Sequence, residues 1–158
     1  GKVEERDFVE WGRRAASNAE VKFTDEMKEN WKAAWAAYFG EGFETKEGYV
    51  GKMDAFAAGG EESVQMAIPI NALLFKCVDL NGDGVCSLKE YRSFIQPLGI
   101  YDVDEVKKCF DIIDTNGDGV IDDKEFASAC AHYYADNTVS PFQNFYGLWT
   151  EDSVETTE

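Results

Sequence analysis

Apolar residues recur at helical spacing on both sides of two short polar segments. The first segment is preceded by Ile70, Leu73, Leu74, Phe75 and Val78 and followed by Tyr91, Phe94, Ile95 and Leu98. The second is preceded by Val106, Phe110 and Ile113 and followed by Phe126, Ala129, Cys130 and Tyr133. Repeats of three and four residues are typical of amphipathic helices. The pattern predicts an all-α fold built from helix–loop–helix units, with Pro97 and Gly99 marking the connection between two of them.

The two polar segments repeat each other over twelve positions. Residues 79–90 read D-L-N-G-D-G-V-C-S-L-K-E, and residues 114–125, which start 35 positions later, read D-T-N-G-D-G-V-I-D-D-K-E. Both fit D-x-[DN]-x-[DN]-G-x5-E, the pattern of a calcium-binding loop between two helices. The alternative is a pair of Asx-rich turns that cap helices and bind nothing. Two intact copies with flanking helices favour metal binding.

Calcium takes six to eight oxygen ligands, and alternate residues of a tight loop can direct their oxygens to one point. In this reading the position 12 glutamate supplies two oxygens, position 7 its backbone carbonyl, and position 9 acts through a water where its side chain is short. The predicted ligands of the first loop are Asp79, Asn81, Asp83, Val85, Ser87 and Glu90, and those of the second are Asp114, Asn116, Asp118, Val120, Asp122 and Glu125. We therefore expect two Ca²⁺ sites, with Mg²⁺ as a possible competitor disfavoured by the bidentate glutamate.

The loops differ in charge and meet at one position. The first loop has three ligand carboxylates and the second has four, because Asp122 replaces Ser87. Since more anionic ligands raise cation affinity, we expect the second loop to bind calcium more tightly. Cys86 and Ile121 occupy position 8 of their loops, and we expect them to face each other across a short antiparallel β pairing.

The N-terminal third of the sequence holds weaker copies of the same unit. Residues 1–8 resemble the second half of such a loop running into its following helix, with Trp11 at the position of Phe94. Residues 31–56 resemble a unit whose loop offers hardly any side-chain oxygen. The prediction is a compact globule of four units, the first truncated. Residues 1–65 form a degenerate N-terminal lobe, residues 66–136 the intact pair, and residues 137–158 an aromatic segment with an acidic tail.

Charge and composition exclude several classes of function. The chain of 158 residues has a formal net charge of −16, which repels nucleic acid and anionic lipid. No apolar run is long enough to cross a bilayer. The four cysteines show neither zinc spacing nor a disulfide framework, which favours a reduced, cytoplasmic protein. A single histidine and the lack of nucleotide-binding or nucleophile motifs argue against an enzyme.

These loops resemble those of the EF-hand superfamily. The four unequal units and the aromatic segment Phe142–Trp149 resemble the sarcoplasmic calcium-binding protein and calexcitin-like group, which is related to luciferin-binding proteins and calcium-regulated photoproteins. The resemblance implies one compact globule with the aromatic segment against the cleft between the lobes. Photoproteins use several His-Trp-Tyr groupings, and the single His132 argues against light emission.

Three functions are compatible with this sequence. The first is an intracellular, monomeric calcium-binding protein that acts as a buffer or in calcium signalling. The second, implied by the resemblance, is calcium-regulated binding of an apolar small molecule of the luciferin kind. The third is a calcium sensor with a protein target, but target grooves of sensors are rich in methionine and only three methionines occur here.

Overall fold

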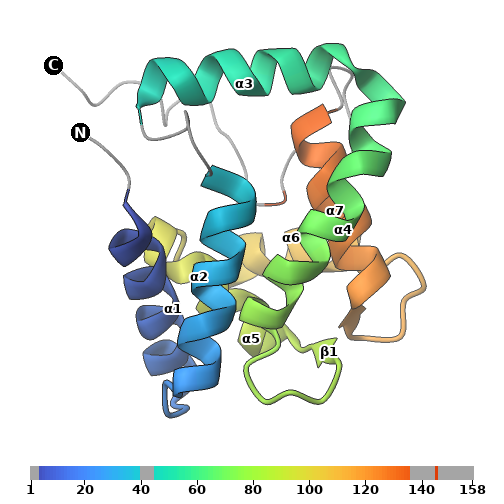
Figure 1. The fold of residues 1–158 in the computed structure, drawn as a ribbon. Helices are drawn as coiled ribbons and strands as arrows, with labels where there is room; N and C mark the ends of the chain where they lie inside the picture. Colours follow the sequence, from blue (N-terminus) through green and yellow to red (C-terminus); the bar gives the residue numbers. More distant parts are fainter. Residues whose placement is uncertain (1–3, 40–44, 136–144, 146–158) are drawn as a thin grey trace, which may run out of the picture.

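The computed structural model describes residues 4–39, 45–135 and 145. The elements follow in the order α1 (Glu5–Ala19), α2 (Asp25–Phe39), α3 (Lys46–Ala58), α4 (Gly60–Val78), β1 (Val85–Cys86), α5 (Leu88–Ile95), the 3₁₀ turn η1 (Gln96–Leu98), α6 (Val103–Ile113), β2 (Ile121–Asp122) and α7 (Asp123–Ala135). Figure 1 shows α1 beside α2, the pair α4 and α7 in contact, and α3 lying across the ends of α4 and α7. The prediction of an all-α fold with one short β pairing is confirmed.

The β pairing joins the two polar loops. β1 and β2 are antiparallel, with Val85 opposite Asp122 and Cys86 opposite Ile121. Both position 8 side chains are fully buried, at 0% exposed. The predicted contact between Cys86 and Ile121 is confirmed, and it links the backbones of the two loops directly.

Aromatic side chains join the N-terminal helices to the intact pair. Trp11 of α1 stacks on Phe94 of α5 with ring centroids 4.9 Å apart, and its indole Nε1 donates to the Phe94 carbonyl oxygen at 2.6 Å. Phe8 packs edge-on against Trp11 and Trp31 at 5.3 Å each. Since such rings contribute most of the buried area of a core, α1 and α2 share one core with α4–α7.

A glycine lets α1 and α2 approach closely. Trp31 is completely buried, and a Cβ atom at Gly12 would lie 2.3 Å from its Nε1. The indole therefore occupies the space that any other residue at position 12 would need. Among the described residues the Trp31 Nε1 atom has no hydrogen-bond partner, which is unfavourable for a buried donor.

Helix α4 is longer than the apolar pattern predicts. The helical spacing is clear from Ile70 onward, but α4 begins ten residues earlier, at Gly60, and continues through Pro69. An interior proline removes one backbone hydrogen bond and disfavours a helix by roughly 3 kcal/mol. Extensive packing of α4 against α7 and α2 offsets this cost. The predicted lobe boundary between residues 65 and 66 falls inside this helix.

Helix α3 is bound to the rest of the molecule by one face only. It has no fully buried residue; Tyr49, Met53 and Phe56 are half-buried and recur at helical spacing. Gly60, at φ +53°, turns the chain sharply from α3 into α4. The helix pair α2 and α3 flanks residues 40–44, as expected for the second degenerate unit, although the loop itself lies outside the described residues.

Of the predicted aromatic C-terminal segment, the structure describes Phe145 alone. This side chain is 1% exposed and packs against Phe126, with ring centroids 5.2 Å apart. The Tyr91 hydroxyl donates a hydrogen bond to the backbone carbonyl of Phe145. Phe145 is therefore part of the core of the intact pair; the rest of the segment lies outside the described residues.

Candidate metal centre

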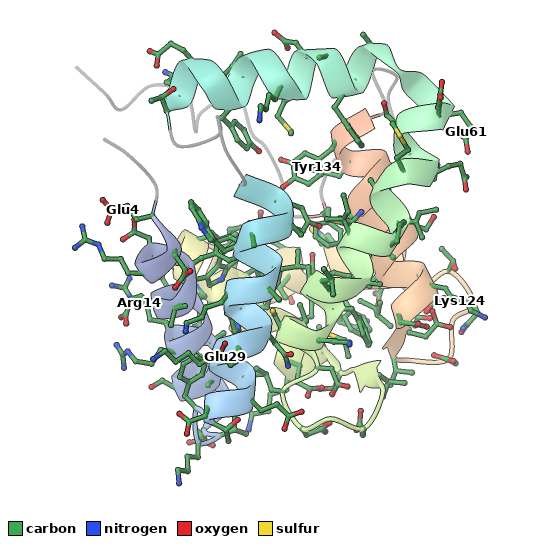
Figure 2. All side chains as sticks on the ribbon, in the orientation of Figure 1. Glu4, Arg14, Glu29, Glu61, Lys124 and Tyr134 are labelled. Atoms are coloured by element: carbon green, nitrogen blue, oxygen red, sulfur yellow. The ribbon has the colours of Figure 1, made fainter. Side chains whose placement is uncertain are left out.

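Each polar loop is held between two capped helices. In the first loop Asp79 is the C-cap of α4, and Ser87 is the N-cap of α5 with its hydroxyl accepting the Glu90 amide at 3.3 Å. In the second loop Asp114 is the C-cap of α6, and Asp122 Oδ1 accepts the Glu125 amide at 2.8 Å. Figure 2 shows the second loop beside Lys124 at the edge of the molecule. Capping fixes where the chain leaves one helix and starts the next.

The carboxylate of the aspartate at position 1 accepts hydrogen bonds from the backbone amides in the middle of its loop. Asp79 Oδ1 accepts the amides of Gly82 and Asp83 at 2.8 and 3.2 Å, and Oδ2 accepts that of Gly84 at 2.9 Å. Asp114 repeats this with Gly117, Asp118 and Gly119 at 2.9, 3.2 and 2.9 Å. Both loops therefore have the same curvature.

The side chains at positions 3 and 5 each accept a hydrogen bond from the backbone amide two residues further along the loop. The amide oxygens of Asn81 and Asn116 accept the position 5 amides at 2.9 and 2.8 Å. Asp83 and Asp118 accept the amides of Val85 and Val120, each at 3.1 Å. These bonds hold the three predicted side-chain ligands of each loop on the inside of the turn.

A glycine at position 6 permits the bend in each loop. Gly84 and Gly119 have φ values of +87° and +88°, a region that strains residues with a side chain. The glycine of the pattern D-x-[DN]-x-[DN]-G-x5-E therefore stands where the backbone has a positive φ. After this residue the chain turns back towards the helix that carries the last predicted ligand.

The glutamate at position 12 closes each loop. Glu90 Oε1 accepts the amides of Leu80 and Asn81 at 3.0 and 3.2 Å, and Oε2 accepts the Ser87 amide at 2.9 Å. Glu125 Oε1 accepts the amides of Thr115 and Asn116 at 3.0 and 3.1 Å, and Oε2 accepts that of Asp122 at 3.1 Å. One carboxylate therefore joins the start and the end of the loop, which places both of its oxygens next to the other predicted ligands.

The residues form an oxygen-rich site and not a dense acidic cluster. Within residues 4–39, 45–135 and 145, no three His, Cys, Asp or Glu side chains gather as a metal cluster. The carboxylate oxygens point to backbone amides, and asparagine and backbone oxygens complete the predicted ligand set. Asp79 Oδ2 and Asp114 Oδ2 each accept a single amide, which leaves a second lone pair on each of these oxygens for a cation. An all-oxygen set of this kind fits hard cations such as calcium.

The thiol between the two loops is shielded. Cys86 is fully buried, and burial, followed by the charges of Glu90 and Asp79, raises the pKa of its thiol well above the ordinary value. A protonated thiol is a poor nucleophile. This environment fits the packing role of Cys86 and not a redox sensor.

Comparisons with known families match both loops. A sequence model of the EF hand domain matches residues 105–133, and a second EF hand model matches residues 70–95. These two segments are EF hands. Each covers one loop and its flanking helices, so the hand around loop 79–90 comprises α4 and α5, and the hand around loop 114–125 comprises α6 and α7. A comparison with curated protein sequences found no match.

Solved structures with the same fold include proteins that are calcium-loaded or named as calcium-binding. The coelenterazine-binding protein of Renilla muelleri, in its calcium-loaded apo form, has a TM-score of 0.74 and 23% identity over 94% of this chain and 86% of its own. Calcium-loaded apo-aequorin from Aequorea victoria has a TM-score of 0.67 and 18% identity over 89% and 84%. A calcium-binding protein of Streptomyces coelicolor has a TM-score of 0.64 and 21% identity over 85% and 87%. The chain therefore has the fold of the luciferin-binding and photoprotein group.

A buried polar cluster, which the sequence did not predict, ties the two EF hands to α2. Asn71 of α4 is 1% exposed, and its amide donates to the Ala127 carbonyl of α7 at 3.1 Å. The Tyr38 hydroxyl of α2 donates to Asn71 Oδ1 and lies 3.5 Å from the Cys130 sulfur. Burial is the main cause of the strongly raised pKa of Tyr38, so this phenol stays protonated. The cluster thus fixes α4 against α7.

Two lysines lie near the first EF-hand loop. Lys22 and Lys76 line a hollow of about 410 Å³ together with Asp79 and Asn81. Their charges lie on the side of the loop that α2 approaches. They are the only basic residues among those lining this described hollow, and their effect on a bound cation is repulsive.

Among the described residues, no helix is long and apolar enough to cross a membrane.

Proposed function

We propose that the two EF-hand loops each bind one calcium ion and that the protein is an intracellular, non-catalytic calcium buffer. The ligands are the residues expected from the sequence: Asp79, Asn81, Asp83, Val85, Ser87 and Glu90 in one loop, and Asp114, Asn116, Asp118, Val120, Asp122 and Glu125 in the other. The main support for this proposal is that the position 12 glutamate of each loop accepts hydrogen bonds from amides at the start of the same loop. This geometry brings the oxygens of distant positions in each loop together, as a cation with six to eight oxygen ligands requires.

A buffer is favoured over a sensor because the apolar face of the EF-hand pair is already covered. Sensors open on binding calcium and expose an apolar groove to a target. Here Phe94 packs against Trp11 and Trp31 of α1 and α2. The bond from Asn71 to Ala127 also joins the helix that leads into the first loop to the helix that leaves the second. Opening the pair would break these contacts.

Calorimetric titration with calcium tests the proposed sites. We expect two bound ions in the parent chain and one in each of the variants Glu90→Gln and Glu125→Gln. Glu62→Gln, an exposed glutamate on α4, is the matched control and should still bind two. Loss of neither site, or of both sites, in the single variants would contradict the assignment of one ion to each loop.

A dye that fluoresces on apolar surface separates buffer from sensor. The buffer proposal expects the same dye signal with calcium and with a chelator. A steep rise on adding calcium would instead indicate a sensor that exposes a groove for a protein target.

A second candidate is binding of an apolar small molecule under calcium control. It is favoured by the fold shared with the Renilla protein that binds coelenterazine. Against it, the rings of Phe8, Trp11 and Trp31 pack directly on one another in the described core. Saturable, calcium-sensitive quenching of tryptophan fluorescence by coelenterazine would support this function, and the absence of quenching would exclude it.

Magnesium is the expected competitor at both loops. In the structural neighbour berovin, all three calcium-binding loops bind magnesium ions. Since a bidentate glutamate suits calcium better, millimolar magnesium should weaken the apparent calcium affinity here without abolishing binding.

A further inference from the structure

The segment that connects the two EF hands carries a concentration of exposed apolar side chains. Leu98, Tyr101 and Val103 are 46%, 65% and 51% exposed, and they lie within six positions of the chain. Leu98 also lines a hollow of about 410 Å³ with Trp11 and Pro97. Three residues span at most about 10 Å, so the Tyr101 backbone lies within this distance of Leu98. We call Trp11, Pro97, Leu98, Tyr101 and Val103 the α1–η1 surface.

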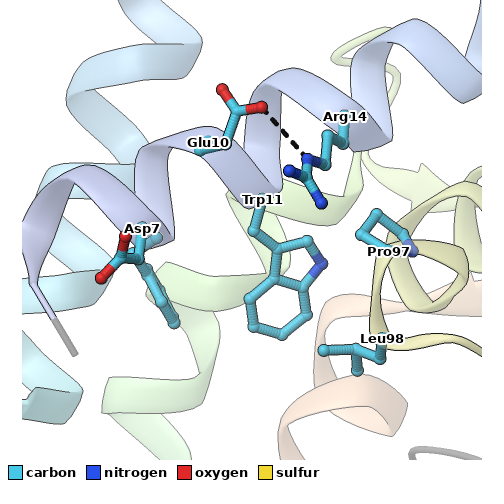
Figure 3. A pocket seen from close by; sticks show the side chains of 7 residues that line it. Asp7, Glu10, Trp11, Arg14, Pro97 and Leu98 are labelled. Carbon is cyan, nitrogen blue, oxygen red and sulfur yellow. Dashed lines mark hydrogen bonds and ion pairs between the residues drawn. The ribbon is translucent and has the colours of Figure 1, made fainter. Parts of the chain in front are cut away.

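The floor of the hollow is fixed. Figure 3 shows the Trp11 indole between Asp7 on one side and Pro97 and Leu98 on the other. The hydrogen bond from Trp11 to the Phe94 carbonyl and the stacking on Phe94 hold the ring in place from behind. A binding surface that is already in shape loses little side-chain entropy when a partner binds.

The charges around the α1–η1 surface are mainly negative. Arg14, above the hollow, is paired with Glu10 at 3.1 Å, and Glu10 also pairs with Arg13 at 2.6 Å. These two arginines hold the pKa of Glu10 at about 2, so the carboxylate stays charged. Asp7 lines the hollow without an arginine or lysine partner among the described ion pairs. Asp102 and Asp104 are exposed on either side of Val103.

We propose that the α1–η1 surface binds a basic segment of another protein. One apolar side chain of that segment enters the hollow over Trp11, and its lysines or arginines lie next to Asp7, Asp102 and Asp104. Charge complementarity decides the kind of partner, because anionic groups around an apolar surface attract cations and repel acidic proteins. A second copy of this chain, with a net charge of −16, is repelled. The surface lies outside the metal loops, so the proposal stands apart from calcium binding.

The probe is a labelled amphipathic peptide of about 18 residues built from leucine and lysine at helical spacing. Its affinity is measured by fluorescence anisotropy at about 0.15 M salt, where weak long-range attraction is screened. Leu98→Ser is the test variant and Val50→Ser the matched control, since both side chains are 46% exposed and Val50 lies on α3. We expect about tenfold weaker binding for Leu98→Ser and less than about twofold change for Val50→Ser.

Charge is tested separately. Asp104→Asn should weaken binding of the leucine–lysine peptide about threefold, whereas Glu62→Gln, exposed on α4, should leave it within the error of the measurement. A peptide with glutamate in place of lysine should not bind. Circular dichroism checks that all variants are folded.

Two results would overturn the proposal. Equal affinities of Leu98→Ser and Val50→Ser would mean that the peptide is held by general attraction to an acidic protein. A dimer of the parent chain in analytical ultracentrifugation that Leu98→Ser dissociates would make a second copy the occupant of this surface.

Discussion

The two EF-hand loops have nearly the same backbone and different surroundings. The hydrogen bonds to Asp79 and Asp114 agree within 0.1 Å. Glu90, however, is 5% exposed and receives the Ser87 hydroxyl at 2.6 Å, whereas Glu125 is partly exposed and receives the Thr115 hydroxyl at 2.9 Å. The shared Asp, Asn and Gly residues determine the shape of a loop, and we expect the variable positions to adjust how tightly each loop binds calcium.

Removal of calcium should produce the largest change in the free energy of unfolding, and it should show that the two loops contribute differently. Calcium at about 100-fold above the dissociation constant adds about 2.7 kcal/mol to the free energy of unfolding for each occupied site. We expect chelation to lower the stability of the parent chain by about 5 kcal/mol when both sites are filled at this excess. In calcium, Glu125→Gln should lose more stability than Glu90→Gln, because we expect the second loop, with its fourth ligand carboxylate, to bind calcium more tightly.

Urea denaturation with and without chelator measures these differences. In chelator, the remaining loss in each variant measures the hydrogen bonds of the glutamate within its loop, and it is subtracted from the loss in calcium. A larger loss for Glu90→Gln in calcium would reverse the predicted order of the loops.

The paired residues at position 8 should contribute unequally to stability. Ile121 and Cys86 are both fully buried, but isoleucine loses more volume on truncation. Ile121→Ala should lower the free energy of unfolding by about 3 kcal/mol, and Cys86→Ala by about 1 kcal/mol. The measurement is denaturation in excess calcium. Equal losses would mean that the core between the loops relaxes around either cavity.

Exchange of the position 9 residues should change calcium affinity about tenfold. Ser87→Asp adds a fourth ligand carboxylate to the first loop, and Asp122→Ser removes one from the second. We expect tighter binding at loop 79–90 in the first variant and weaker binding at loop 114–125 in the second, each resolved by calorimetry. If neither affinity moves, the difference between the loops arises elsewhere, for example in the burial of Glu90.

The lysines beside the first loop should have the smallest effect. Lys76→Gln removes a positive charge near Asp79 and should raise the calcium affinity of the first loop about twofold at low salt. Screening should remove most of this gain at about 1 M salt. Lys46→Gln on α3 is the control and should leave the titration unchanged. A gain that persists in high salt would show that the effect is not electrostatic.

The sequence predicted the parts of this molecule that are encoded locally. The loops, their glycines and the helices around them follow from residue type and spacing, and the opposition of Cys86 and Ile121 follows from their equal loop positions. The equivalence of Trp11 and Phe94 also had a structural meaning, because the two rings stack.

Contacts between distant segments could not be predicted in this way. The bond between Tyr38 and Asn71 joins residues 33 positions apart, and that between Trp11 and Phe94 joins residues 83 apart. Neither hydrogen bond produces a periodic pattern of residues in the sequence. The start of α4 at Gly60 is not encoded in the apolar repeat, which is clear only from Ile70 onward, and Pro69 lies inside the helix because packing outweighs its cost.

The buried cysteines make the accessibility of their thiols a measure of whether the protein is folded. All four are buried and none is in a disulfide, and burial raises the pKa of the Cys77 thiol as well as that of Cys86. Alkylating reagents attack only thiolates that they can reach. In the native protein these thiols should therefore not react with such reagents. Labelling of one of them would show that the structure around it has opened.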